Sequence, residues 1–249
     1  MKPPMEEIPS VNRKDPIMKK NIIAMLLAMT TVFPACASVV ITGTRVIYPA
    51  TEREVTVKME NKGSSPVLIQ SWVDNGDPAS TPDTATAPFL LTPPINRVNA
   101  GKGQTLRIRF TGETLPQDKE SVFYLNVLEI PPTVKGELAE KNLLSMAFRS
   151  RLKLFYRPQN LIKNASEAPE NVVWKRQGNK VTANNATPYH VTVAYFSEDE
   201  KGEKNLGAGG MLTPGETRTW TLDRVSTRWY PMIINDYGAL RPVDTNKNK

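Results

Sequence analysis

The stretch NLLSMAFRSRLKLFYRP, residues 142–158, alternates between two kinds of side chain over most of its length. Read with a period of two, one face carries Leu144, Met146, Phe148, Leu152, Leu154 and Tyr156, interrupted only by Ser150. The opposite face carries Arg149, Arg151 and Lys153. Because successive residues of a strand point to opposite sides of the sheet, the pattern predicts one long strand with an apolar row and a basic row.

A helical interpretation of this stretch stays open at this point, because Leu144, Phe148, Leu152 and Phe155 also follow a helical spacing. A helix would scatter the other apolar residues around its surface, although the stretch lacks the β-branched residues that would decide the matter. The pattern favours the strand. At about a dozen residues it would be about twice the usual strand length. A strand that outruns its neighbours leaves a hydrogen-bonding edge with which another chain can pair.

The first 37 residues have the pattern of an export signal. A short basic stretch at 18–21 precedes an apolar run at 22–32, and small residues at 35–37 come directly before Ser38. The apolar run is too short to span a bilayer. We therefore expect the segment to be removed by cleavage near Ala37/Ser38, which makes the mature chain an exported protein.

The start of the chain and its single cysteine leave alternatives open. Residues 1–17 precede a natural-looking signal, so the true start is either Met1 or Met18. Cys36 either lies just before the cut or is the lipidated first residue of a lipoprotein, and the approach Phe-Pro-Ala at 33–35 argues against lipidation. With the favoured cut, the mature chain has no cysteine and no disulfide, although export would permit one.

Charge and composition exclude several classes of function. The net charge is +7, and the first 37 residues hold five Lys or Arg and three Asp or Glu, which leaves +5 for the mature chain. Such an excess suits an acidic partner or a carboxylate ligand. The charges are interspersed and the chain is exported, so nucleic acid is not an expected partner. No stretch after Ser38 is apolar enough to cross a membrane, so we expect no membrane insertion of the mature chain.

Catalytic patterns are scarce. His190 is the sole histidine, and we interpret it as a half-exposed strand residue. Metal sites built on His and Cys are excluded, no carboxylate spacing supports a cage, and no serine lies in a G-x-S-x-G motif. Asp74, Asp77 and Asp83 lie in a loop rich in Pro, Ser and Thr, where turn formation is the better explanation. We therefore expect neither an enzyme nor a cofactor.

Short alternating runs separated by Pro, Gly, Asn and Asp fill residues 38–157, followed by a polar break and a second series of runs. Turn signals at this spacing predict β-sandwiches rather than βαβ units. The charged, glycine-rich segment 197–210 is predicted to be a mobile loop. The expected organisation is residues 1–37 as extension and signal, 38–157 as a first β domain, 158–165 as a hinge and 166–249 as a second β domain.

Two basic residues lie on predicted strands, Arg45 in ITGTRVIY and Lys153 in the long strand. Two cations placed together in a cleft between domains could bind a carboxylate through charge-assisted hydrogen bonds. The alternative is that both are solvated charges on strand faces, and the pattern alone favours this alternative.

Several motifs occur in a fixed order: TRVIY at 44–48, TPPINRV at 92–98, LPQDKESVFYLNVLEIPP at 115–132, RLKLFYRP at 151–158, TPYHVT at 187–192 and INDYGALRP at 234–242. On these motifs the chain resembles the periplasmic pilus (fimbrial) chaperones of the chaperone–usher pathway over residues 38–243. The resemblance implies an all-β fold with two immunoglobulin-like sandwich domains arranged as a boomerang with an interdomain cleft.

The resemblance also implies a mechanism. In this family each pilus subunit is an immunoglobulin-like fold without its last strand, and the chaperone lends its long strand to the open groove, which is donor-strand complementation. The donor-strand residues here would be Leu144, Met146 and Phe148. Arg45 and Lys153 match the family's cleft cations, which would bind the C-terminal carboxylate of the subunit.

Glu120, Arg157 and Asp236 match the family's interdomain ion network, which we expect to hold the domain angle. The short stretch before the lent strand, Thr133–Lys141, has no cysteine pair and so resembles the short-loop subclass. The expected function is to prevent aggregation of pilus subunits in the periplasm and to deliver them to an outer-membrane usher.

Two further points stay open from the sequence. The alternative function is an exported structural or adhesive protein, such as a pilus subunit or a carbohydrate-binding module. A subunit would carry an N-terminal donor segment and usually a disulfide, and a sugar site would want an exposed aromatic cluster. The free chaperone could also form a self-dimer through its exposed strand.

Overall fold

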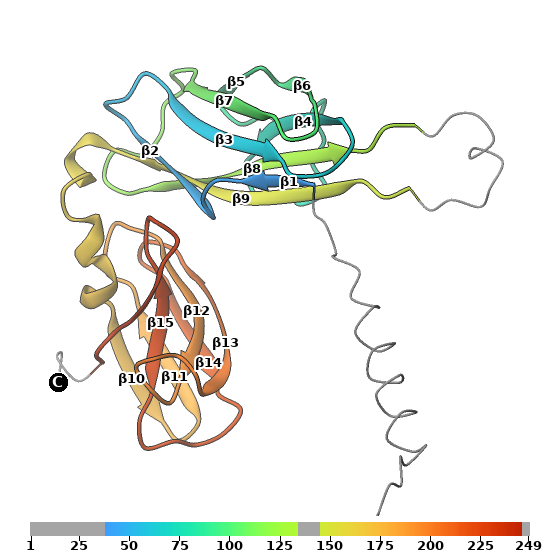
Figure 1. Cartoon of the computed structure of the whole chain (residues 1–249). Helices are drawn as coiled ribbons and strands as arrows, with labels where there is room; N and C mark the ends of the chain where they lie inside the picture. Colours follow the sequence, from blue (N-terminus) through green and yellow to red (C-terminus); the bar gives the residue numbers. More distant parts are fainter. Residues whose placement is uncertain (1–37, 134–144, 246–249) are drawn as a thin grey trace, which may run out of the picture. The chain divides into compact units, whose positions relative to one another are not determined.

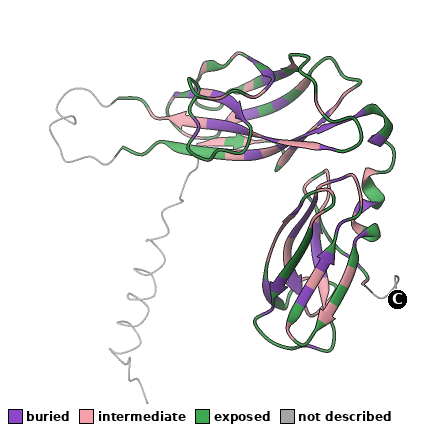
Figure 2. Ribbon diagram, turned by 180° about the vertical axis from the view of Figure 1, so that it is seen from behind, coloured by how far each residue is buried: buried purple, intermediate pink, exposed green. Residues whose placement is uncertain are grey.

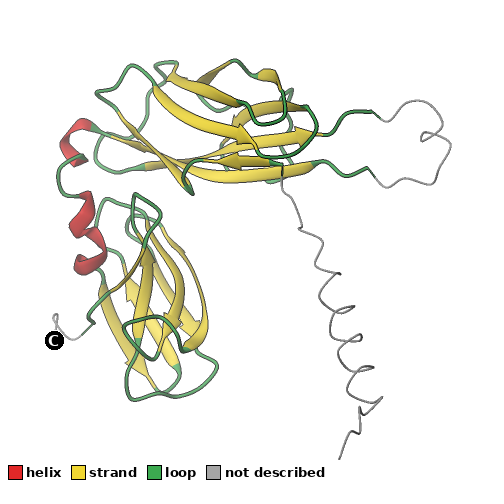
Figure 3. Ribbon diagram, viewed as in Figure 1, coloured by secondary structure: helices red, strands yellow, loops and turns green. Residues whose placement is uncertain are grey.

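The computed structural model describes residues 38–133 and 145–245, and nearly all of their regular structure is β-strand (Figures 1 and 3). The opening stretch contains β9 (Phe148–Arg157), so the strand interpretation is confirmed and the helical one is wrong. The strand begins later than the pattern suggested, because residues 145–147 lie outside any strand. Leu144 lies outside the described residues.

Strands β1 to β9 form the two sheets of a first domain (Figure 1). One sheet has the order β1 (Val39–Ile41), β3 (Val55–Asn61), β7 (Gly103–Phe110) and β5 (Phe89–Thr92). The other has the order β2 (Arg45–Pro49), β9, β8 (Ser121–Ile130), β4 (Val67–Asp74) and β6 (Ile95–Val98). The domain is a two-sheet sandwich.

The sandwich forms because these strands place apolar side chains on one face. In β7, Leu106 and Ile108 are 0% exposed, while Arg107 between them faces solvent. Leu125 of β8 and Leu154 of β9 are also 0% exposed and belong to the same core. This alternation of buried and exposed residues along the strands is visible in Figure 2. Burial of each such side chain contributes about 1.5–3 kcal/mol, so the inward row of each strand fixes its register.

Strands β10 to β16 form the two sheets of a second domain, reached through the short 3-10 helices η3 (Gln159–Leu161) and η4 (Ala165–Asn171) (Figure 3). One sheet has the order β10 (Val173–Gln177), β11 (Lys180–Asn184) and β14 (Thr217–Thr221). The other has the order β13 (Asn205–Leu212), β12 (Val191–Ser197), β15 (Tyr230–Ile234) and β16 (Leu240–Pro242). A separate core of buried apolar residues fills this domain.

The glycine-rich segment that we predicted as a mobile loop is partly a strand. β13 pairs with β12 along most of its length, so the prediction for residues 205–210 is wrong. A Cβ atom at Gly209 would overlap the carbonyl group of Val193 on the neighbouring strand. The glycine is there because the two backbones approach closely, and not because the segment needs to move.

The tryptophans of the second domain meet in its core. Trp174, Trp220 and Trp229 surround Phe196 with ring centroids 6.2, 5.3 and 6.4 Å from the Phe196 ring. Phe196 is 0% exposed. These rings stabilise the domain from inside, so they do not form the exposed aromatic platform that a carbohydrate-binding module would need.

Candidate functional site

The two edges of β9 are paired to different extents. β8 runs antiparallel to the whole strand, from Glu129 opposite Phe148 to Ser121 opposite Tyr156. On the other edge β2 runs parallel to β9, but its pairing starts with Arg45 opposite Lys153. Within the described residues, the segment 148–152 therefore has no partner on this edge. We call it the unpaired half of β9, and we call 153–157 the paired half.

The edge is open because the chain changes sheets just before β2. β1 pairs with β3 in the opposite sheet, and of these first two strands β2 alone lies beside β9. Between them Gly43 adopts a φ of 92°, a conformation that favours glycine, and the N–H of Thr42 donates to the carbonyl of Lys58 at 2.8 Å. The first strand is thus held away from the unpaired half.

The apolar row of β9 changes character along the strand. Phe148 is 53% exposed, whereas Leu152 is 8% and Leu154 is 0% exposed. Met146, just before the strand, is 54% exposed. Exposed large apolar side chains beside an unpaired backbone edge make a surface that another strand can cover. Of the predicted donor residues, Met146 and Phe148 lie on this surface.

Arg45 and Lys153 lie opposite each other where the unpaired half ends. The Nη1 of Arg45 donates to the carbonyl oxygen of Ile234 at 2.9 Å, but its buried Nε has no hydrogen-bond partner. Among the ion pairs of the residues described, neither cation takes part. The structure thus brings together two cations that the sequence separates by more than a hundred positions.

Burial and mutual repulsion disfavour the charged forms of this pair. Burial lowers the pKa of Lys153, and the neighbouring Arg45 guanidinium lowers it further. Burial also lowers the pKa of Arg45, although the carboxylates of Asp236 and Glu120 act in the opposite direction. A bound anion would relieve this repulsion and supply the missing acceptors.

Arg157, at the end of β9, binds two carboxylates. Its Nε donates to Glu120 at 2.7 Å, and its Nη1 and Nη2 donate to the two oxygens of Asp236 at 2.7 and 3.1 Å. The Glu120 side chain is 1% exposed, and its second oxygen accepts the N–H of His190 at 2.8 Å. Burial would lower the pKa of Arg157, but these carboxylates outweigh it and raise the pKa. The contacts connect the first domain to the β12 and β15 ends of the second.

Sequence reasoning missed the tertiary contacts of two residues, His190 and Asp74. The side chain of His190 is only 4% exposed, with its ring 5.4 Å from that of Phe155, so our interpretation of a half-exposed strand residue is wrong. Asp74 does accept the N–H of Gly76 at 2.8 Å, as a turn residue would. It also pairs with Arg151, which lies 77 positions away. No local pattern reveals either contact.

The described residues contain no group of three or more His, Cys, Asp or Glu that could hold a metal ion. They also contain no helix with the length and hydropathy needed to cross a membrane. The geometry that remains is an open strand edge with an apolar row, ending at a pair of cations.

Family models account for nearly all of the described chain. The model for "Pili and flagellar-assembly chaperone, PapD N-terminal domain" matches residues 38–162, and that for "Pili assembly chaperone PapD, C-terminal domain" matches residues 167–245. The chain belongs to the PapD-like family of pilus-assembly chaperones. The prediction of an all-β protein with two immunoglobulin-like domains is therefore confirmed.

Individual relatives agree with this family. The chaperone is 41% identical over 233 residues to "Chaperone protein HifB" of Haemophilus influenzae, covering 90% of this chain and 95% of the relative. The crystal structure of the YadV chaperone matches with a TM-score of 0.67 at 37% identity, over 82% of this chain and 97% of that one. The SafB chaperone of Salmonella enterica, solved in complex with the SafA pilin, matches with a TM-score of 0.69 at 27% identity, over 83% and 94%.

These similarities decide the class of function. The protein is a periplasmic pilus chaperone of the chaperone–usher class that binds pilin subunits, and its family is not one of enzymes. The alternative of a structural or adhesive protein is set aside. The comparisons do not assign roles to individual residues.

Proposed function

We propose that this chaperone captures a pilus subunit along the unpaired half of β9 and holds its C-terminal carboxylate with Arg45 and Lys153. The observation that carries the proposal is that the open edge ends at two cations, neither of which forms an ion pair among the described residues. An added strand would continue the sheet at the place where β2 begins.

Strand addition divides the work between backbone and side chains. The backbone N–H and C=O groups of residues 148–152 that face the open edge would supply main-chain hydrogen bonds that do not depend on subunit sequence. Met146 and Phe148, together with Leu144, would insert into the apolar groove that the missing strand leaves in the subunit. Because these residues alternate, the groove accepts them only from the correct face.

The carboxylate would set the register of this pairing. A chain terminus occurs once per subunit, so the binding of that terminus at Arg45 and Lys153 determines which donor residue meets which pocket. The guanidinium of Arg45 has an unused buried donor at Nε, which a carboxylate oxygen would satisfy.

We assign the contacts among Glu120, Arg157 and Asp236 to holding the two domains in place, and we place the hinge at residues 158–165. The Arg157 guanidinium is a planar fork that suits two carboxylates from different elements. In this arrangement it spans from β9 to the turn after β15.

Four further features of this chaperone concern its export, its subclass and its other partners. We propose export with cleavage near Ala37/Ser38, membership of the short-loop subclass, delivery of the subunit to an outer-membrane usher, and occlusion of the same edge by a self-dimer in the free protein. The short, cysteine-free stretch Thr133–Lys141 supports the subclass. The exposed edge of β9 supports the self-dimer, because an uncovered edge favours pairing.

The test is to replace each cation by alanine and measure the subunit that co-purifies with the chaperone from periplasm. Truncating one partner of a desolvated charge pair costs about 2–5 kcal/mol, so Lys153→Ala or Arg45→Ala should lower the affinity by about 30-fold or more. Lys58→Ala and Arg107→Ala, which remove exposed strand-face cations of the same domain, are the matched controls. Wild-type subunit levels with Lys153→Ala would disprove the carboxylate anchor.

A further inference from the structure

The cation that anchors the subunit has two basic neighbours on its own strand. Arg149, Arg151 and Lys153 occupy every second position of β9 and therefore share its outer face. Neighbouring members of this row are about 6.6–6.8 Å apart along the strand. A captured strand that slipped by two residues would meet Arg151 in place of Lys153.

The alternation of the apolar and basic faces does not by itself exclude such a slip. A shift of one residue would turn every side chain to the wrong face, but a shift of two restores the alternation. The register is then specified by the anchoring charge and by the fit of individual side chains, since Ser150 interrupts the apolar row. If Arg151 were available at the edge, its fork of donors would bind a carboxylate at least as well as the ammonium of Lys153.

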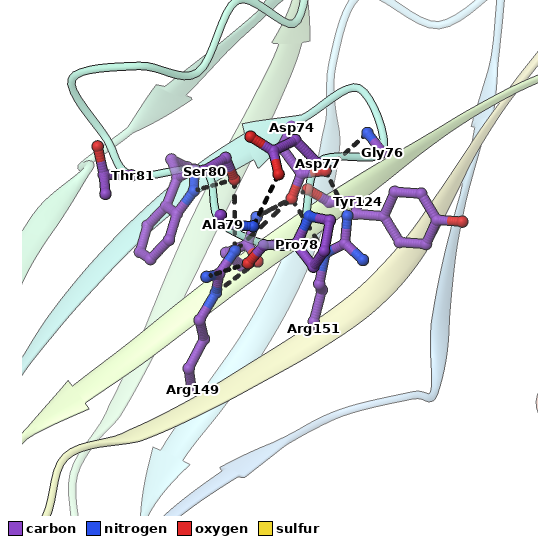
Figure 4. Close-up of polar contacts among 12 residues, drawn as sticks. Asp74, Gly76, Asp77, Pro78, Ala79, Ser80, Thr81, Tyr124, Arg149 and Arg151 are labelled. Carbon is purple, nitrogen blue, oxygen red and sulfur yellow. Dashed lines mark hydrogen bonds and ion pairs between the residues drawn. The ribbon is translucent and has the colours of Figure 1, made fainter.

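The structure keeps Arg151 away from the unpaired edge. Its side chain extends across β8 to Asp74 at the end of β4. The guanidinium carbon of Arg151 lies 3.8 Å from the centroid of the Tyr124 ring. Its Nε donates to Asp74 Oδ2 at 3.1 Å, and its Nη2 donates to Oδ1. In Figure 4, Arg151 and Arg149 both extend from β9 toward Asp74 and the loop that follows it.

Arg149 is held on the same side. Its Nε donates to Asn126 at 2.9 Å and its Nη1 donates to the carbonyl of Pro78 at 2.9 Å, while its Nη2 lies 3.8 Å from Asp74. Its guanidinium also lies 4.7 Å from the ring of Trp72. Of the three basic residues in the row, only Lys153 has no carboxylate partner among the described residues.

The surroundings of Asp74 hold its side chain in place and favour its charged form. Its side chain is 1% exposed, and Asn126 donates to its Oδ2 at 2.7 Å. Burial would raise its pKa, but the hydrogen bonds from Arg151, Asn126 and the N–H of Gly76 outweigh burial and lower it. The carboxylate is therefore charged at neutral pH, and both arginines remain neutralised.

We propose that Asp74 selects the register of subunit capture by holding Arg151 and Arg149 away from the unpaired edge, which leaves Lys153 as the available cation of the row. The inference rests on the proposed carboxylate anchor. Asp74 is a positioning residue here, because it acts through Arg151 and does not touch the subunit.

The deciding experiment is rescue of one variant by another, with the subunit that co-purifies with the wild-type chaperone as the probe. Lys153→Ala alone should lose capture. Adding Asp74→Asn releases Arg151 to the edge, and the double variant should capture about tenfold more subunit than Lys153→Ala, the scale of one charge-assisted contact. A third change, Arg151→Met, should abolish this gain.

Controls separate positioning from folding. Asp74→Glu keeps the charge that holds Arg151, so Asp74→Glu with Lys153→Ala should capture no more than Lys153→Ala. Glu198→Gln, which breaks the ion pair with Arg224 elsewhere in the chain, should likewise give no rescue. Asp74→Ser, which still accepts the N–H of Gly76, replaces Asp74→Asn if the latter does not fold.

The outcomes are distinct. If the folded double variant captures no more subunit than Lys153→Ala, then Asp74 does not select the register, while the anchor itself stands. Full capture by Lys153→Ala alone would overturn the anchor, and the role of Asp74 with it.

Discussion

The two halves of β9 belong to one strand, share one pairing partner in β8, and behave as different surfaces. In the paired half, β2 covers the second edge, and Leu154 is 0% exposed. In the unpaired half the second edge is open, and Phe148 is 53% exposed. The difference arises outside β9, because the chain changes sheets between β1 and β2.

A stable domain can therefore carry a strand edge that is open to pairing with another chain. The half that holds the domain together buries its apolar row, so its stability does not depend on a partner. In the other half, Leu152 next to the paired half is still buried in the core, whereas Phe148 is exposed. Its arginines are paired with Asp74 and its neighbours on the outer face, which leaves the exposed ring of Phe148 and the open edge available. The division predicts that the two halves respond differently to substitution.

The largest effect is expected at the end of the paired half. Arg157→Ala leaves the carboxylate of Glu120, 1% exposed, without its cation, and loss of one partner of a buried pair costs about 3–5 kcal/mol. Little of this should come from Asp236, which is 38% exposed. Urea unfolding should report the loss. Arg241→Ala, on an exposed residue of β16, serves as control, and equal effects of the two changes would refute the special role of Arg157.

A second prediction compares the apolar row across the two halves. Leu154→Ala should lower the free energy of unfolding by about 2–5 kcal/mol, because it opens a cavity in the core. Phe148→Ala should change it by less than about 0.5–1 kcal/mol, because the ring is half exposed. Urea unfolding of both variants tests the contrast directly. A large loss with Phe148→Ala would mean that the unpaired half is core.

A third prediction is that substitution of Phe148 affects capture of a subunit much more than it affects the stability of the free chaperone. Phe148→Asp would place a charge in the apolar groove of the subunit, so co-purification should fall about tenfold or more while the melting temperature of the free chaperone stays nearly unchanged. Phe148→Leu is the control that keeps an apolar side chain. If Phe148→Asp captured subunit normally, the donor-strand role of Phe148 would be wrong.

The sequence predicted the strand and its two rows, since a period of two follows from residue types alone. It could not predict where the pairing with β2 begins, because that depends on a sheet change at Gly43, about a hundred residues earlier. From the pattern, Arg45 and Lys153 were more simply two solvated charges. Only the family resemblance brought them together, and the register of β2 and β9 places them opposite each other.

The other wrong or missing predictions share one cause. A sequence pattern reports on neighbouring residues, whereas the contacts that matter here join residues far apart in the chain. The glycines at 207–210 predicted a loop, but the close backbone of β12 explains Gly209. The turn at Asp74 was read correctly from its neighbours, whereas its bond to Arg151 joins β4 to β9 across β8. No residue near His190 in the sequence indicates that its backbone N–H donates to the carboxylate of Glu120.

The smallest predicted effect concerns acid and the outer face of the unpaired half. The pKa of Asp74 is lowered in the folded chain, so the unfolded chain binds the proton first as the pH falls. The contribution of Asp74 to stability is therefore fully present above its ordinary pKa of about 3.9 and is lost as the pH falls through the lowered value. We expect Asp74→Asn to cost about 1–2 kcal/mol at neutral pH, and this difference from wild type to shrink as the pH falls below about 4. Unfolding by urea between pH 2.5 and 7 measures it, with Glu60→Gln on the exposed surface as control. A difference that does not change with pH would mean that the charge of Asp74 contributes nothing to holding the arginines.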